Sequence, residues 1–149
     1  MEELFKHLDT LHLNKNEYAI TGSGPLYAHG LISSIDNDLD IIVQTEAWKK
    51  CLKHGVPIKG EFGDLIINLF NNQIQIFNGW SITNELVSDI IKDSKIYKGY
   101  PFASLEHVLS YKKKLLRLKD IYHIKLIKKH LKNSKSKFGS DISEKNKAG

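Results

Sequence analysis

The sequence predicts a single α/β (α+β) domain, in which a small mixed β-sheet is flanked by helices and two further helices follow at the C-terminal end. Short runs of β-branched and other apolar residues alternate along the chain with amphipathic helical patterns. The 149 residues are about one domain's length. With 41% hydrophobic and 26% charged residues, the composition is close to that of an average globular protein, so a sizeable core is expected.

Five elements are predicted in the first part of the chain, each from a local pattern. Leucines at near-helical spacing favour the first helix, and Pro25 suits the first turn of the second. The second strand is rich in β-branched residues. Thr45 can cap the third helix, and Gly55 can end it. The predicted elements are helix 2–13, strand 18–21, helix 26–31, strand 39–43 and helix 46–54.

The second part of the chain begins with two apolar runs that the polar residues 71–73 separate, which is typical of a β-hairpin. A later extended segment is broken by Gly99 and Pro101, and Ser104 is a good N-cap for the helix after it. The predicted elements are strands 65–70 and 74–77, helix 85–93, the extended segment 96–102, helix 104–116 and helix 119–131.

The folded domain is expected to span residues 1–132. Residues 133–149 contain only Phe138 and Ile142 as large apolar side chains, which predicts a disordered basic tail. Residues 112–149 carry 13 Lys or Arg against 3 Asp or Glu, whereas residues 1–111 carry 9 against 14. This asymmetry favours an anionic partner such as RNA or DNA phosphates for the C-terminal third, and a solvated lysine-rich face is the alternative.

Several classes of protein are excluded by what the sequence lacks. No apolar run approaches the roughly 18 residues of a membrane span, so no membrane interaction is expected. The charged, amphipathic first residues contain no apolar signal region, which favours a cytoplasmic location. The single cysteine, Cys51, excludes an intramolecular disulfide and a cysteine-based zinc site. Tyr27 stands where a dinucleotide-binding fingerprint requires its third glycine.

Residues 18–43 contain the pattern that points to chemistry. Asp38 and Asp40 flank Leu39 at the start of a strand, so period-two geometry places both carboxylates on one face. Two adjacent carboxylates repel each other unless a cation lies between them, and oxygen ligands of this kind suit Mg²⁺ or Mn²⁺. The alternative interpretation is that the aspartates only end the strand.

A phosphate-binding turn is predicted just before this pair. Gly22 and Ser23 follow the first strand and precede a short helix. Backbone N–H groups of such a turn, together with a helix N-terminus, favour a phosphate group. The alternative is that the glycine only allows the chain to turn.

These motifs resemble a known family. Ile20-Thr21-Gly22-Ser23, followed by Asp38-Leu39-Asp40-Ile41, is similar to the motif of the DNA polymerase β nucleotidyltransferase superfamily. Gly99-Tyr100-Pro101, the helix over 104–112 and Arg117-Leu118-Lys119-Asp120 resemble later motifs of its small stand-alone members. The motifs occur in the expected order, and the resemblance covers about residues 4–132.

The resemblance implies a nucleotidyltransferase fold that binds an NTP with Mg²⁺ or Mn²⁺. The implied reaction transfers a nucleoside monophosphate to a hydroxyl of a small molecule, a protein or RNA, and releases pyrophosphate. The implied metal ligands are Asp38 and Asp40, and the implied phosphate-binding residues are Gly22, Ser23, Lys112, Arg117 and Lys119.

One position departs from the family pattern. Gln75 stands where the family has a third catalytic carboxylate, and Asp64 is the nearest acid in the sequence. A neutral amide can offer one oxygen to a metal but is a poor base. Two alternatives therefore stay open: a catalytically degenerate nucleotide- or nucleic-acid-binding module, and an antitoxin-type partner protein of the same fold. For Asp120, pairing with Arg117 or capping of the last helix is the favoured role.

Overall fold

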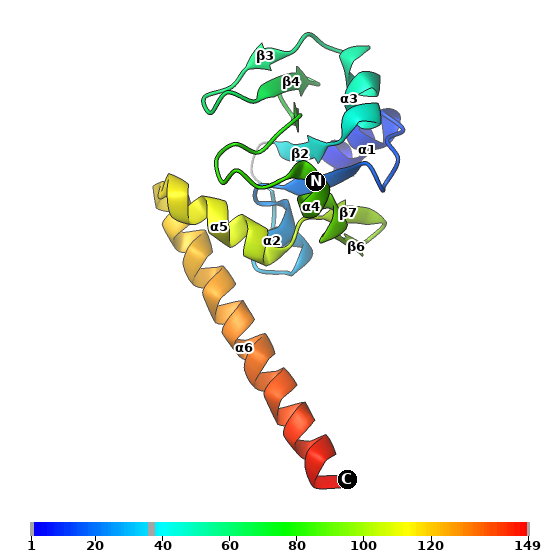
Figure 1. Ribbon diagram of the computed structural model, residues 1–149. Coiled ribbons are helices and arrows are strands. Elements are labelled where there is room, and N and C mark those ends of the chain that lie inside the picture. Colours follow the sequence, from blue (N-terminus) through cyan, green and yellow to red (C-terminus); the bar gives the residue numbers. More distant parts are fainter. Residues whose placement is uncertain (1, 36–37, 149) are drawn as a thin grey trace.

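The computed structural model describes the backbone of residues 2–35 and 38–148 and the side chains of residues 3–35 and 38–134. Within these residues it forms a mixed α/β fold with six helices and one seven-stranded sheet (Figure 1). The helices are α1 (Glu2–Thr10), α2 (Gly24–Ala28), α3 (Thr45–Leu52), α4 (Val87–Lys92), α5 (Leu105–Leu115) and α6 (Leu118–Ala148). The strands are β1 (Tyr18–Thr21), β2 (Leu39–Val43), β3 (Ile58–Lys59), β4 (Leu65–Leu69), β5 (Ile74–Phe77), β6 (Lys95–Tyr97) and β7 (Tyr100–Phe102). The predicted mixed sheet flanked by helices is confirmed.

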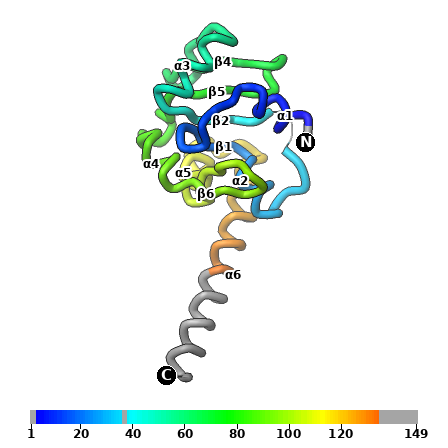
Figure 2. The backbone as a smooth tube through the Cα atoms, turned by 90° about the vertical axis from the view of Figure 1, so that its right-hand side faces the viewer, coloured from blue at the N-terminus to red at the C-terminus, as the bar shows by residue number. Residues whose placement is uncertain are grey.

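The strand order of the sheet is β3-β4-β5-β2-β1-β7-β6. Figure 2 shows most of this order as a stack, with β4 at the top and β6 at the bottom. β2 pairs antiparallel with β1 and parallel with β5, and β1 pairs parallel with β7. The central strand is therefore β2, and β1 lies next to it; the two motifs of the segment 18–43 lie on or directly beside these strands.

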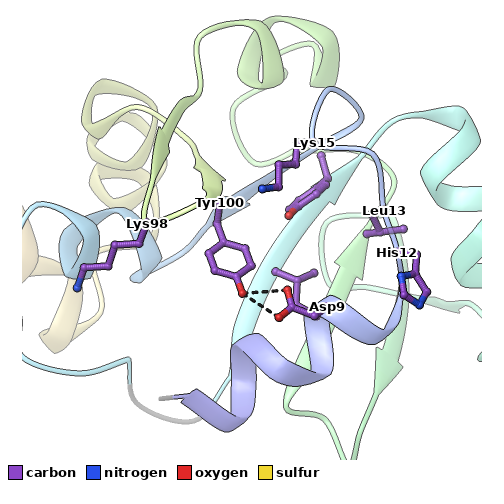
Figure 3. A pocket seen from close by; sticks show the side chains of 9 residues that line it. Asp9, His12, Leu13, Lys15, Lys98 and Tyr100 are labelled. Atoms are coloured by element: carbon purple, nitrogen blue, oxygen red, sulfur yellow. Dashed lines mark hydrogen bonds between the residues drawn. The ribbon is translucent and has the colours of Figure 1, made fainter.

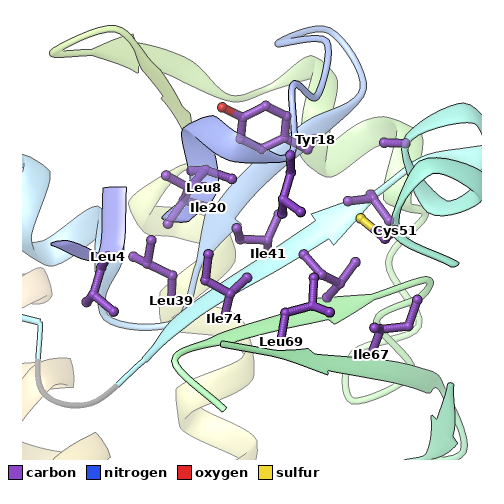
Figure 4. Close-up of a cluster of buried hydrophobic side chains, with 14 of the residues drawn as sticks. Leu4, Leu8, Tyr18, Ile20, Leu39, Ile41, Cys51, Ile67, Leu69 and Ile74 are labelled. Atoms are coloured by element: carbon purple, nitrogen blue, oxygen red, sulfur yellow. The ribbon is translucent and has the colours of Figure 1, made fainter. Parts of the chain in front are cut away.

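Helices cover both faces of the sheet because the central strands carry apolar side chains on both sides. Leu39, Ile41 and Val43 of β2 pack with side chains of α1 and α3 in one core cluster (Figure 4). Ile42 points to the other face and packs with residues of α4, α5 and α6 in a second cluster. Period-two alternation places Asp40 on this second face, beneath the C-terminal helices.

The segment 96–102, predicted as one extended stretch, is instead the β6–β7 hairpin. Tyr97 pairs with Tyr100, so only Lys98 and Gly99 form the turn. Both turn residues have positive φ, 51° and 88°, as the type I′ turn favoured in two-residue hairpins requires. The sequence pattern of glycine and proline showed a break here but not the direction of the chain after it. The short strand β3 was likewise not predicted.

The two C-terminal helices follow the predicted signals at their start. The Ser104 side chain accepts a hydrogen bond from the backbone N–H of His107 and so caps α5, as expected. α5 ends at Leu116, which has a left-handed backbone conformation, and α6 packs against it. None of the helices in the described residues is long and apolar enough to cross a membrane.

α6 continues through Ala148, so residues 133–148 are helical here, where the sequence predicts a disordered tail. The segment contains no proline, and lysine is a good helix former, so only weaker helix formers such as Gly139 oppose the helix after Leu131. The prediction that this segment adds nothing to the stability of the domain is a separate matter and stays a prediction.

Deletion of residues 134–149 is expected to leave the melting temperature unchanged within about 2 °C, since the segment offers only two large apolar side chains for burial. Differential scanning calorimetry of the full chain and the truncated chain tests this. A drop of more than about 5 °C would show that the end of α6 packs against the domain.

Candidate functional site

A row of four polar side chains crosses the second face of the sheet. In register, Asp40 of β2 lies opposite Thr21 of β1 on one side and Gln75 of β5 on the other. Gln75 in turn lies opposite Asn68 of β4. Side chains of directly paired residues lie on the same face of a sheet, so these four are neighbours. The sequence predicted Asp40 and Gln75 for this site but missed Thr21 and Asn68.

The turn after β1 lies directly against Asp40. Gly22 has a φ of +66°, and a Cβ atom built there would lie 2.6 Å from Oδ2 of Asp40. Only glycine fits this position without displacing the carboxylate. Because β1 and β2 are antiparallel, the turn residues Gly22 and Ser23 follow β1 at the same end of the two strands where Asp38 precedes β2. The structure thus brings together the predicted turn and the predicted pair of aspartates.

The α2 helix that follows the turn has five residues, and the Ser23 side chain makes no capping hydrogen bond. A helix this short contributes little dipole, so phosphate binding at this turn would depend on its backbone N–H groups more than on the helix.

Asp40 is held in an environment that disfavours its charge. Its Oδ1 atom is buried and has no hydrogen-bond partner among the described residues. Burial, and next the charge of Asp38, raise the pKa of Asp40 to about 7. Lys119, Lys112 and Arg117 act in the opposite direction and lower it. The carboxylate therefore has positive groups near it, but its Oδ1 atom has no direct partner in the described part of the chain.

The three predicted phosphate-side cations differ in their availability. Lys112 is buried, and its Nζ donates to Oδ1 of Asp120 at 2.9 Å. Arg117 donates to the same carboxylate from Nε at 2.7 Å and from Nη2 at 3.1 Å. Asp120 also accepts from the backbone N–H of Arg117 at 3.0 Å, so it both pairs and caps the start of α6. Lys119 is exposed and makes no ion pair with a described residue.

A buried histidine, His107, contacts Thr21 of this row. Nε2 of His107 lies 3.0 Å from Oγ1 of Thr21, and Nδ1 lies 3.0 Å from Oε1 of Glu85. Burial lowers the pKa of His107, so the ring is neutral: its Nδ1–H donates to the carboxylate and its Nε2 accepts from the threonine. These residues are far apart in the sequence, and no local pattern links them.

Glu85, at the end of this chain of hydrogen bonds, remains charged. Burial raises its pKa, but hydrogen bonds from Thr83, His107 and Ser110 outweigh that effect and lower it overall. This chain of hydrogen bonds from Thr21 through His107 to Glu85 fixes the direction of the Thr21 hydroxyl beside Asp40.

Asp64, the other candidate for the third acid, lies elsewhere. Its carboxylate accepts from the backbone N–H of Ser81 at 2.8 Å and from the Ser81 hydroxyl at 2.7 Å. The β4–β5 register places Asp64 opposite Gly79, four residues along the strand from Gln75, which is about 13 Å. Gln75 therefore occupies the position beside Asp40.

Trp80, just after the end of β5, is a core side chain. It is buried, and its ring centroid lies 5.0 Å from that of Tyr111 and 5.2 Å from that of Phe77.

The oxygen atoms at and beside Asp40 are of the chemical type that binds a divalent cation. Carboxylates come from Asp38 and Asp40, and a neutral amide oxygen comes from Gln75. One strand farther along the row, the Oδ1 atom of Asn68 is buried and has no hydrogen-bond partner among the described residues. Hard cations such as Mg²⁺ take this type of ligand together with water and phosphate oxygens. No group of three His, Cys, Asp or Glu side chains gathers as a metal site in the described part of the chain. Among the described residues, a resident cation would thus have two charged ligands, Asp38 and Asp40.

Comparison with known proteins gave no match: no protein-family model, no curated protein and no solved structure is significantly similar to this chain.

Proposed function

We propose that the chain has a nucleotidyltransferase fold and binds a nucleoside triphosphate with Mg²⁺ or Mn²⁺ at the end of β1 and β2. The observation that supports this most is the buried, unpartnered oxygen of Asp40, beside Asp38 and directly beneath the Gly22 turn. A carboxylate whose pKa is raised first by burial of its oxygen and then by a second carboxylate is expected where a cation normally completes the site.

Each group then has a defined part. Asp38 and Asp40 would hold the cation, whose charge offsets that of the phosphates and of the leaving pyrophosphate. Gly22 and Ser23 present backbone N–H groups to the phosphates at the open edge of the sheet. Lys119 is the exposed cation that has the largest effect among the basic residues on the pKa of Asp40, and it can reach a phosphate without breaking an ion pair.

Lys112 and Arg117 support the site at a distance in this proposal. Their charges act on Asp40, while their side chains stay bonded to Asp120. They orient the start of α6, and with it Lys119, instead of binding the nucleotide by themselves.

Gln75 favours a second candidate function, nucleotide binding without turnover. In the implied reaction a third carboxylate beside the pair activates the attacking hydroxyl, and an amide cannot take up that proton at neutral pH. Binding needs only the pair of aspartates, the turn and the cation, so it survives where transfer is slow. The antitoxin-type role corresponds to the same proposed activity with a partner protein as the acceptor.

Transfer of label from α-labelled ATP, CTP, GTP or UTP tests the first function. The protein is incubated with Mg²⁺ or Mn²⁺ and with small-molecule, protein and RNA acceptors, and Asp40→Asn serves as the control. Label on an acceptor that is lost in the control supports transfer. Metal-dependent binding without label supports the binding module, and the absence of both contradicts the proposal.

Gln75→Glu is expected to raise any basal transfer rate by about 10²-fold, because a carboxylate beside Asp40 can accept the proton of the attacking hydroxyl. Gln44→Glu, at the opposite end of β2, adds the same charge away from the site and is expected to change nothing. An equal effect of both substitutions would show that Gln75 is not the third position.

A further inference from the structure

A second concave site lies on the other face of the sheet. α1, α2 and the β6–β7 hairpin enclose a cavity of about 390 Å³, within the range of small-molecule sites. Asp9, Lys98 and Tyr100 also line a smaller cavity of about 200 Å³, which Figure 3 shows. Five of the nine residues that line the larger cavity are aromatic: Phe5, Tyr27, Tyr97, Tyr100 and Phe102.

The aromatic rings of this cavity come from four separate elements. Phe5 of α1 connects them, since its ring centroid lies 4.7 Å from that of Tyr100 and 6.4 Å from those of Tyr27 and Phe102. Phe102 is buried beneath the cavity, whereas Tyr27, Tyr97 and Tyr100 are only half-buried. Parts of three tyrosine rings are thus accessible to a planar ligand.

The charge around these rings is positive. Lys6 and Lys98 line the larger cavity, and Lys15 and Lys98 line the smaller one. Asp9 is an acid that lines both cavities, and its two carboxylate oxygens accept from the Tyr100 hydroxyl at 2.9 and 3.1 Å. Lys98 lies in the tight turn of the hairpin, with its Nζ 5.2 Å from the centre of the Tyr27 ring. The carboxylate is engaged within the protein, and the ammonium groups border the opening.

From this arrangement we propose that the cavity binds a nucleoside phosphate, with the base against the tyrosine rings and the phosphate at Lys98 and Lys6. Aromatic faces bind bases of any sequence by stacking, and neighbouring lysines bind the phosphate. The shared chemistry is that of a free mononucleotide and of one nucleotide within a single strand. A purely hydrophobic ligand would offer the two ammonium groups no negatively charged partner.

This site is independent of Asp38 and Asp40. Phe102 and the α1 residues belong to the core cluster on the first face of the sheet, whereas Asp40 lies on the second face. Binding here requires no divalent cation, so the inference goes beyond the proposed function and does not depend on it. The two sites can be told apart by working in EDTA and with Asp40→Asn.

The test is calorimetric titration of the full chain in EDTA at low salt with four probes: AMP, adenosine, ribose 5-phosphate and a five-residue oligoadenylate. Tyr27→Leu keeps apolar volume but removes the ring, and Tyr122→Leu, an exposed tyrosine on α6, is its matched control. Lys6→Gln with Lys98→Asn removes both charges, and asparagine tolerates the positive φ of position 98. Melting temperatures verify that each variant folds.

We expect AMP to bind with similar affinity in the wild type and in Asp40→Asn. Tyr27→Leu should weaken AMP binding about tenfold, and Tyr122→Leu should not change it. The double lysine variant should weaken AMP about tenfold but leave adenosine unchanged. An oligoadenylate that binds more than tenfold tighter than AMP identifies a strand as the ligand, and equal affinities identify a free nucleotide.

Three results would overturn this inference. One is the absence of AMP and oligoadenylate binding in EDTA by a wild type that is folded. Another is ribose 5-phosphate binding as tightly as AMP, which would remove the role of the rings. The last is an AMP affinity that Tyr27→Leu and Tyr122→Leu leave equally unchanged.

Discussion

Asp40→Asn is expected to make the metal-free protein more stable, by about 2–4 kcal/mol at pH 8.5, while it destroys the proposed metal site. The gain arises because the wild type must keep a buried carboxylate charged beside Asp38 with no cation between them. The pKa of Asp40 rises from 3.8 to about 7 on folding, and each unit corresponds to about 1.4 kcal/mol. The unpaired amide of the asparagine offsets part of the gain.

The pH dependence of this gain has a definite sign. Folded Asp40 keeps its proton up to about pH 7, whereas the unfolded chain releases it near 3.8. The penalty in the wild type is therefore full above pH 7, decreases as the pH falls and vanishes below 3.8. The advantage of Asp40→Asn should shrink by about 2 kcal/mol between pH 8.5 and pH 5.5.

Urea unfolding in EDTA at these two pH values measures the effect. Asp93→Asn, an exposed acid after α4, is the matched control and should change stability by less than about 0.5 kcal/mol. If Asp40→Asn is less stable than the wild type at pH 8.5, then Asp40 has a favourable partner in the folded protein and the argument for a missing cation is wrong.

Asp120→Ala is expected to destabilise the protein by about 3–5 kcal/mol, the largest loss we expect from a single change. Asp120 is fully buried and accepts from Lys112 and Arg117, and its loss leaves the Lys112 ammonium buried without its partner. Burial raises the pKa of Asp120, but the bonds from Arg117 and Lys112 outweigh burial and lower it to about 2. This contribution is therefore present above the unfolded pKa near 3.8 and is lost as the pH falls through about 2.

The double variant Lys112→Met with Asp120→Leu distinguishes a buried ion pair from simple loss of packing. Replacing both partners with apolar groups leaves no unpaired charge, so the double variant should be more stable than Asp120→Ala. Unfolding of all three proteins at pH 7 by urea gives the comparison. A double variant that is as unstable as Asp120→Ala would show that shape, not charge, accounts for the loss.

The parts of the fold that the sequence predicted well are those with a local cause. Strand 39–43 and the hairpin of β4 and β5 follow from alternation and a polar turn, and the pairing of the Gly22 turn with Asp38 and Asp40 follows from two strands that meet at one edge. The β6–β7 hairpin was missed because a two-residue turn with lysine at positive φ has no strong sequence signal.

The rest of the site depends on contacts between distant parts of the chain. Asn68 is placed beside Gln75 only by the β4–β5 register, although an amide within an apolar strand was a visible sign. His107 reaches Thr21 through the packing of α5, which no spacing reveals. Lys112 looked like one more solvent-exposed lysine in a basic run, and its burial depends on Asp120 across the junction of α5 and α6.

The central claim is a nucleotide site that requires Asp38, Asp40 and a divalent cation, and calorimetric titration with an NTP analogue that cannot be cleaved between the α- and β-phosphates tests it most directly. Titrations of the Tyr27→Leu protein with and without Mg²⁺ separate this site from the cavity on the other face. The account predicts binding with Mg²⁺ that weakens at least about a hundredfold in EDTA and when Asp40→Asn is added. An affinity that neither EDTA, Asp38→Asn nor Asp40→Asn changes would contradict it.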